Sequence, residues 1–307
     1  MITTTASGKI ILCGEHAVVY GRPAIAVPVT QVGVRVTIEE NATGLLIHAV
    51  DLDGHYRYSE LDPSQPLGAI IRLALSALGD AAPPNAALTI HSTIPIASGL
   101  GSGTAVSTAI VRALAKYFGR ELDIPTVSAL VYEVEKLHHG TPSGIDNTVI
   151  AFGQPVYFAR DKTLQPFPVP TPFRLVIADT GIASPTKIAV GDVRRAWEAD
   201  HDKYESLFDR CGEIAKSAFD LIQTGQPNDM GPMLTYNHRL LSEMGVSSPE
   251  LDVLVNAALD GGALGAKLSG GGRGGNMIAL VTVETAAEIE QALLNAGAKR
   301  VITTVIG

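Results

Sequence analysis

The chain has 307 residues, of which 46% are hydrophobic and 18% charged, so we expect one large or two ordinary globular domains and exclude a largely disordered protein. Its formal net charge of −8 argues against nucleic acid or an anionic membrane as the main partner. Cys13 and Cys211 have neither metal-ligand nor disulfide-framework spacing, and the chain shows no signal-peptide pattern and no membrane-spanning apolar run, so we expect a cytoplasmic protein.

The first half of the chain alternates short strand-like runs with longer helical patterns. Alternating apolar and polar residues predict a half-buried strand, whereas apolar residues three and four apart predict one face of a helix. On these patterns the predicted elements are strands at 32–39, 45–50 and 87–94 and helices at 67–78 and 125–138.

A proline-rich stretch after Phe158, with prolines at 166, 168, 170 and 172, is the best candidate for a linker. It predicts an N-terminal domain over 1–165 and a C-terminal domain over 166–307. In the second half the predicted elements are strands at 174–179, 276–283 and 300–306 and helices at 186–224, 251–259 and 284–295. Strands and helices mixed in two blocks indicate an α+β protein.

Residues 98–105 read Ser-Gly-Leu-Gly-Ser-Gly-Thr-Ala and precede apolar residues at helical spacing, so a glycine-rich loop is expected to open a helix. The first N–H groups of a helix lack internal partners, and the helix dipole adds positive charge there. This arrangement favours an anion, above all a phosphate. A flexible turn that caps a helix would explain the same residues, so the loop alone leaves both interpretations open.

Lys9, Glu15 and His16 lie close together in the sequence, in an apolar setting. They belong to residues 8–26, which read Gly-Lys-Ile-Ile-Leu-Cys-Gly-Glu-His-Ala-Val-Val-Tyr-Gly-Arg-Pro-Ala-Ile-Ala. Such groups lose hydration energy on burial unless they are paired or contact a ligand. The three together favour a functional site. The alternative is a structural ion pair beside a histidine whose hydrogen bonds are satisfied.

Two carboxylates flank a predicted turn within residues 135–147, which read Glu-Lys-Leu-His-His-Gly-Thr-Pro-Ser-Gly-Ile-Asp-Asn. Glu135 lies near the end of a predicted helix, and the turn presents Asp146. One carboxylate could hold Mg²⁺ while the other acts on a proton or orients a hydroxyl. Alternatively, Asp146 caps the next segment. The pair at 138–139 lacks metal-binding spacing and is interpreted as structural or solvent-facing.

Residues 267–276, Lys-Leu-Ser-Gly-Gly-Gly-Arg-Gly-Gly-Asn, formally contain the GxGxxG pattern, but an apolar strand rather than a helix follows. We therefore reject a dinucleotide-binding site and expect a tight loop against a ligand, with Lys267 and Arg273 supplying positive charge. The alternative is a turn with solvated cations. The chain also lacks the Walker P-loop, the protein-kinase motifs and the GxSxG elbow of hydrolases.

These four segments, in their order along the chain, resemble the GHMP small-molecule kinases. Residues 8–26 are most similar to the form found in the mevalonate kinase branch of that family. Asn-His-Arg-Leu-Leu at 237–241, followed by Gly-Val-Ser at 245–247, fits the same branch. The resemblance runs from Ala6 to about Leu280. It implies a two-domain GHMP kinase fold, in which an N-terminal domain like the second domain of ribosomal protein S5 precedes a ferredoxin-like domain. It also implies ATP, Mg²⁺ and a homodimer.

The resemblance assigns roles to individual residues. Asp146 would be the catalytic base or hydroxyl-orienting carboxylate, with Lys9 beside it stabilising charge on the reacting oxygens. Glu135 would hold Mg²⁺. The triphosphate would be wrapped by Gly99, Leu100, Gly101, Ser102, Gly103 and Thr104. The mevalonate pocket would be lined by Glu15, His16, Thr186, Gly270 and Gly271.

The chain departs from the family pattern at three positions. Gly103 stands where a serine usually binds Mg²⁺, so Ser102 or Thr104 would serve, or Glu135, phosphate oxygens and water would hold the ion. Gly271 stands in place of alanine, and Arg273 replaces a glycine and would contact a phosphate or project into solvent.

The resemblance implies ATP-dependent phosphorylation of the 5-hydroxyl of mevalonate. A GHMP kinase for another small alcohol or phosphomonoester, such as phosphomevalonate or homoserine, is the nearest alternative. A catalytically silent nucleotide-binding relative is another, and Gly103 is the main feature in its favour.

Overall fold

The computed structural model describes residues 1–95, 98–139, 143–158, 165–184 and 186–307. The chain forms two compact units. The first comprises Met1–Lys9, Val32–Ile96 and Gly101–Gly153, and the second comprises Ile10–Gln31, Ala97–Leu100 and Gln154–Gly307. These units do not follow the expected division at 165/166, because prolines mark where the backbone is irregular and not which residues pack together. Within the described residues, no helix combines the length and apolar character needed to span a bilayer.

The strands of the first unit pair around β5. β5 (Ala86–Ser92) is antiparallel to residues 34–40 of β2 (Ala24–Glu40) and parallel to β3 (Leu45–Ala49), which pairs with β4 (Gly54–Arg57). In β2 the side chains of Val34, Val36 and Ile38 are buried while Arg35 is exposed. The alternation predicted from the sequence is therefore confirmed, and it turns one face of β2 toward the core.

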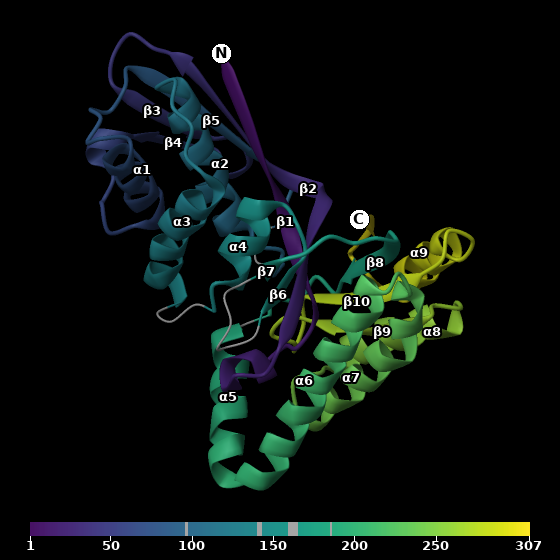
Figure 1. The fold of residues 1–307 in the computed structure, drawn as a ribbon. Helices are drawn as coiled ribbons and strands as arrows, with labels where there is room; N and C mark the ends of the chain where they lie inside the picture. The colour runs from purple at the N-terminus through teal and green to yellow at the C-terminus, as the bar shows by residue number, and fades with distance from the viewer. Residues whose placement is uncertain (96–97, 140–142, 159–164, 185) are drawn as a thin grey trace. The chain divides into compact units, whose positions relative to one another are not determined.

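Helix α2 (Ser102–Tyr117) contacts three other helices and β5. Its buried positions are mostly small or aliphatic, including Ala105, Ala109 and Ala113, so neighbouring elements can approach closely (Figure 1). The other helices of this unit are α1 (Pro66–Ala77), α3 (Ile124–His139) and α4 (Ile145–Phe152), with short 3₁₀ turns at Val50–Leu52 and Tyr58–Glu60. α1 and α3 confirm the predicted helices, whereas α4 was not predicted.

The second unit contains a four-stranded antiparallel sheet in the order β11-β8-β10-β9. Its strands are β8 (Phe173–Asp179), β9 (Gly265–Ser269), β10 (Asn276–Val281) and β11 (Arg300–Ile306). Helices follow β8 and β10, so the connectivity is that of a ferredoxin-like fold. The fold class implied by the family resemblance is therefore confirmed. β6 (Val156–Phe158) pairs with Ala24–Ala26 of β2 and with β7 (Gln165–Pro166).

Helices α7 (Gly231–Glu243) and α8 (Pro249–Asp260) pack on β9, and α9 (Ala286–Asn295) packs on β8 and β11 (Figure 1). The predicted helix over 186–224 is two helices, α5 (Thr186–Ala199) and α6 (His201–Gln223). Asp200 separates them, and its carboxylate accepts a hydrogen bond from the Lys203 N–H as the cap of α6. Two 3₁₀ turns, η1 (Ala17–Tyr20) and η4 (Pro227–Met230), pack against α6.

Candidate active site

The glycine-rich segment opens α2, as its sequence predicts. Gly101 is the N-cap residue, with a φ of +77° that favours glycine. The first backbone bond of the helix runs from the Ala105 N–H to the Gly101 carbonyl, so the N–H groups at 102–104 have no partner within the helix. With the positive end of the helix dipole, they form an anion site suited to phosphate. The two preceding loop residues, Gly99 and Leu100, belong to the second unit.

Gly101 and Gly103 provide a matched test of this loop. A Cβ on Gly101 would lie 2.9 Å from Ile150 Cδ1 and 3.1 Å from Lys9 Cγ, whereas a Cβ on Gly103 meets nothing within 4 Å. Gly101→Ala is therefore expected to lower the Tm, because the left-handed backbone alone costs about 1–2 kcal/mol, and to raise the KM for ATP. Gly103→Ala keeps or raises the Tm. Thermal unfolding checks both variants, and equal Tm losses would contradict the assignment.

Asp146 lies in the first turn of α4, where Gly144 and not Asp146 is the N-cap residue. The interpretation of Asp146 as a cap is therefore wrong. Lys9 Nζ, from β1 (Ile2–Cys13), lies 3.0 Å from Asp146 Oδ2; the Lys9 side chain is 8% exposed and that of Asp146 34%. Asn147 Nδ2 donates to both Ser128 oxygens, which holds α4 against α3. Asp146 is thus a partly exposed carboxylate on a fixed turn beside a buried ammonium group.

Glu135, near the end of α3, accepts a 2.8 Å hydrogen bond from Thr104 Oγ1 in the first turn of α2. Ser102, the first residue of α2, is half-buried. Nowhere in the described parts of the chain do three or more His, Cys, Asp or Glu residues gather to hold a metal. One carboxylate beside a hydroxyl at the start of a helix suited to phosphate nevertheless fits Mg²⁺, which takes most of its ligands from phosphate and water. The His138 and His139 side chains fall outside the described structure.

Residues 14–16 form a strained turn before η1. Gly14 has a φ of +95°, and a Cβ there would lie 2.4 Å from the Pro23 carbonyl oxygen. His16 has a φ of +56°, which is uncommon for a residue with a side chain. Backbone strain of this kind persists only where packing over-determines it, and it clusters at functional sites.

The expected cluster of Lys9 with Glu15 and His16 divides between the two units. Lys9 belongs to the first unit and pairs with Asp146, whereas Glu15 and His16 belong to the second. There Glu15 Oε1 accepts a hydrogen bond from Lys267 Nζ of β9, and both side chains are almost fully buried. The apolar setting read from the sequence is thus correct, but the ion-pair partner of Glu15 comes from a distant segment.

His16 is held as a neutral ring. Its Nε2 lies 3.1 Å from the Gly271 carbonyl oxygen, and because a carbonyl can only accept, Nε2 carries the proton. Burial lowers the pKa of His16 to about 4, so the ring is uncharged at neutral pH. Nδ1 is then an acceptor; it is buried and has no hydrogen-bond partner among the residues described.

The third glycine segment connects β9 to β10, which confirms that it is not a dinucleotide fingerprint. A Cβ on Gly271 would lie 2.8 Å from Thr186 Oγ1, at the exposed start of α5, so the glycine in place of alanine fits this close approach. Lys267 is buried and paired with Glu15, so it is not a solvated cation. Arg273, whose side chain is 35% exposed, donates to Asp192 and to the Gly245 carbonyl.

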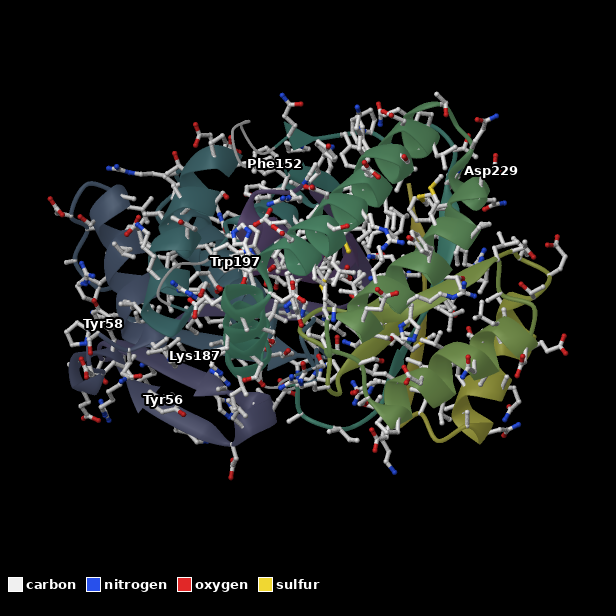
Figure 2. The ribbon with its side chains drawn as sticks, turned by 90° about the horizontal axis from the view of Figure 1, so that it is seen from below. Tyr56, Tyr58, Phe152, Lys187, Trp197 and Asp229 are labelled. Carbon is white, nitrogen blue, oxygen red and sulfur yellow. The ribbon has the colours of Figure 1, made fainter. Side chains whose placement is uncertain are left out.

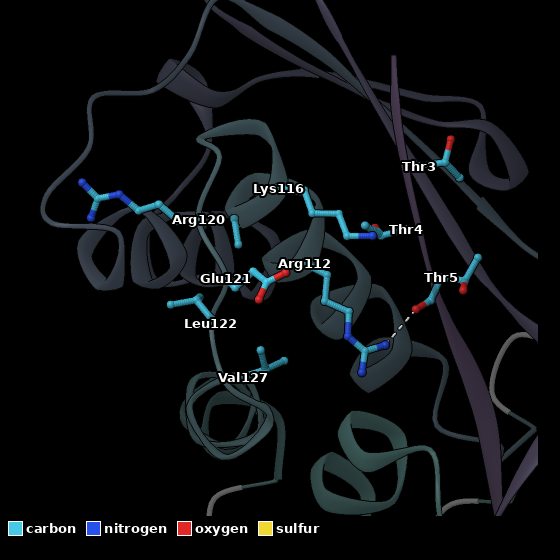
Figure 3. A pocket seen from close by; sticks show the side chains of 10 residues that line it. Thr3, Thr4, Thr5, Arg112, Lys116, Arg120, Glu121, Leu122 and Val127 are labelled. Carbon is cyan, nitrogen blue, oxygen red and sulfur yellow. Dashed lines mark hydrogen bonds between the residues drawn. The ribbon is translucent and has the colours of Figure 1, made fainter.

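The first unit also carries a hollow of about 450 Å³ beside β1, the C-terminal half of α2 and the start of α3 (Figure 3). Arg112 in this hollow donates to the carbonyls of Thr5 and Ala151 and so ties β1 and α4 to α2. None of the predicted site residues lines it. It lies toward the opposite end of α2 from the N–H groups at 102–104, and we assign it no functional part.

Comparison with known proteins identifies the family. Family models for the N-terminal and C-terminal domains of GHMP kinases match residues 67–154 and 218–299. The chain belongs to the GHMP kinase family. Mevalonate kinases from Thermococcus onnurineus and Thermococcus gammatolerans are 34% and 33% identical to it, over 99% of this chain and 96% of each relative. The crystal structure of L. major mevalonate kinase in complex with R-mevalonate matches with a TM-score of 0.85 and 28% identity, covering 100% of this chain and 96% of that one.

Proposed function

We propose that this protein is a kinase that transfers the γ-phosphoryl group of ATP to the 5-hydroxyl of mevalonate, giving 5-phosphomevalonate and ADP. Its full-length similarity to mevalonate kinases supports the substrate. The contact between Lys9 and Asp146, in the unit whose α2 offers free N–H groups to phosphate, carries the proposal of phosphoryl transfer. A silent relative would have no need of such a pair.

In the proposed reaction Asp146 accepts the proton of the 5-hydroxyl as the new O–P bond forms and the bond to the ADP oxygen breaks. Lys9 stabilises negative charge on the reacting oxygens. The N–H groups at 102–104 hold the phosphates, with Gly99 and Leu100 completing the loop. Bound Mg²⁺, held through Glu135 and the Ser102 hydroxyl, would offset charge on the transferred phosphoryl group. The site residues need only position the reactants and balance their charge.

We assign mevalonate binding to Glu15, His16, Thr186, Gly270 and Gly271. Phosphomevalonate would bring a phosphate that needs further cations. Arg273 was the candidate for that task, and its guanidinium is bound to Asp192 and to the Gly245 carbonyl. Lys187, beside Thr186 on α5, is exposed and remains the nearest cation in sequence to the assigned substrate residues (Figure 2).

ADP release by the purified protein with Mg-ATP tests the proposal, with mevalonate, phosphomevalonate, homoserine and galactose offered in parallel. We expect release with mevalonate alone. Release with another acceptor only would keep the kinase and overturn the substrate. ATP binding without release for any acceptor would instead support the silent relative and direct attention to Gly103.

A homodimer in the cytoplasm, with no nucleic acid or membrane partner, remains part of the proposal. The molar mass in solution, measured by light scattering, tests the dimer.

A further inference from the structure

The ion pair between Glu15 and Lys267 is the most deeply buried charge pair among the described residues, with side-chain exposures of 1% and 0%. We propose that Lys267 is a positioning residue for the substrate: it holds the Glu15 carboxylate turned so that its second oxygen accepts a hydrogen bond from a substrate hydroxyl. This inference rests on the proposed function. Lys267 acts through Glu15, to which its ammonium group is bonded.

The position of Lys267 is set by its strand. β9 approaches the start of α7 so closely that a Cβ on Gly265 would lie 1.9 Å from the Gly231 carbonyl oxygen, so only glycine fits. The Leu268 N–H donates to His238 Nδ1 at 3.3 Å, and His238 Nε2 lies 3.2 Å from Asp252 of α8. With β10 paired along its other edge, β9 is held on several sides, and Lys267 has little freedom to turn away.

The two acceptors beside this pair point to a hydroxyl as the ligand. Glu15 Oε1 is taken by Lys267, whereas Glu15 Oε2 is buried and has no hydrogen-bond partner in the described structure. His16 Nδ1, on the next residue, is likewise a buried acceptor without a described partner. Buried acceptors are costly unless a donor reaches them. A hydroxyl supplies a proton donor, whereas a carboxylate would be repelled by Glu15.

The charge of Lys267 is what keeps Glu15 useful as an acceptor. The pair lies near the buried thiols of Cys13 and Cys211, whose pKa values are raised by burial, in the case of Cys211 to about 12. In such surroundings a carboxylate without a counter-ion has an uncompensated desolvation cost and is no longer fixed in orientation. A pair that serves only the fold would stabilise the second unit without any effect on substrate affinity.

The test is a double-mutant cycle of Lys267→Met, Glu15→Gln and the two combined, with Lys216→Met, an exposed lysine of the same unit, as the control. We measure the Tm, kcat and the KM for mevalonate and for ATP. We expect Lys267→Met to raise the KM for mevalonate about tenfold or more. The KM for ATP should stay within about twofold.

The combined variant distinguishes a positioning role of Lys267 from a role in the fold alone. It also keeps the inference testable if either single variant fails to fold, because it leaves no unpaired buried charge. We expect it to recover the Tm and to have the same raised KM for mevalonate as Glu15→Gln alone, because Lys267 acts through Glu15. An unchanged KM for mevalonate in Lys267→Met, or additive effects of the two changes, would overturn the inference. If the unaltered protein did not phosphorylate mevalonate, the proposed function itself would be refuted.

Discussion

Replacing Asp146 by Asn is expected to lower kcat by roughly 10²- to 10⁴-fold, the contribution of a positioned general base. Asparagine has the same shape but cannot accept the hydroxyl proton. The affinity for ATP should change little, because the N–H groups that we propose to bind the phosphates belong to α2 and not to α4. Steady-state kinetics with mevalonate and equilibrium binding of ATP measure the two effects separately.

Glu121→Gln is the matched control for Asp146→Asn, since Glu121 is an exposed carboxylate of the same unit. It should leave kcat unchanged. If Asp146→Asn retained full turnover, Asp146 would have no part in the reaction. A loss of turnover that came with an equal loss of ATP binding would point to a structural role for α4.

Lys9→Met should lower kcat by about 10²- to 10³-fold, the usual effect of removing one group that stabilises charge in the transition state. Methionine keeps most of the aliphatic stem, so the packing against Gly101 is retained and only the ammonium group beside Asp146 is lost. The measurement is kcat together with the Tm of the variant. Lys116→Met, an exposed lysine on α2, is the control.

Combining Lys9→Met with Asp146→Asn sharpens this prediction. If the two residues act as one unit on the same hydroxyl, the double variant should be little slower than the slower single variant. Losses of turnover that multiply would mean that Lys9 and Asp146 contribute independently, and the proposed division of labour between them would be wrong.

Most elements with a clear local pattern were predictable. The alternation in β2 and the apolar stripes of α1 and α3 are properties of neighbouring residues, and the structure confirms them. Several elements were missed, among them α4, α7 and β9. α4 is short and begins at a glycine, α7 begins with Gly-Pro, and β9 is buried at every position and so shows no alternation.

The sequence by itself determined the local chemistry: a glycine-rich loop that opens a helix, a segment that places Glu15 and His16 in an apolar setting, and a second glycine loop that leads into a strand. These depend on residues close together in the chain, where spacing and backbone freedom decide the conformation. Only the tertiary structure decided the partners of the charged groups. Lys9 pairs with Asp146, and Glu15 pairs with Lys267, which lies 252 residues away in the sequence. Strand pairing and helix packing determine which distant side chains are buried together. Burying an unpaired charge has a high desolvation cost, so the buried charges are found in pairs.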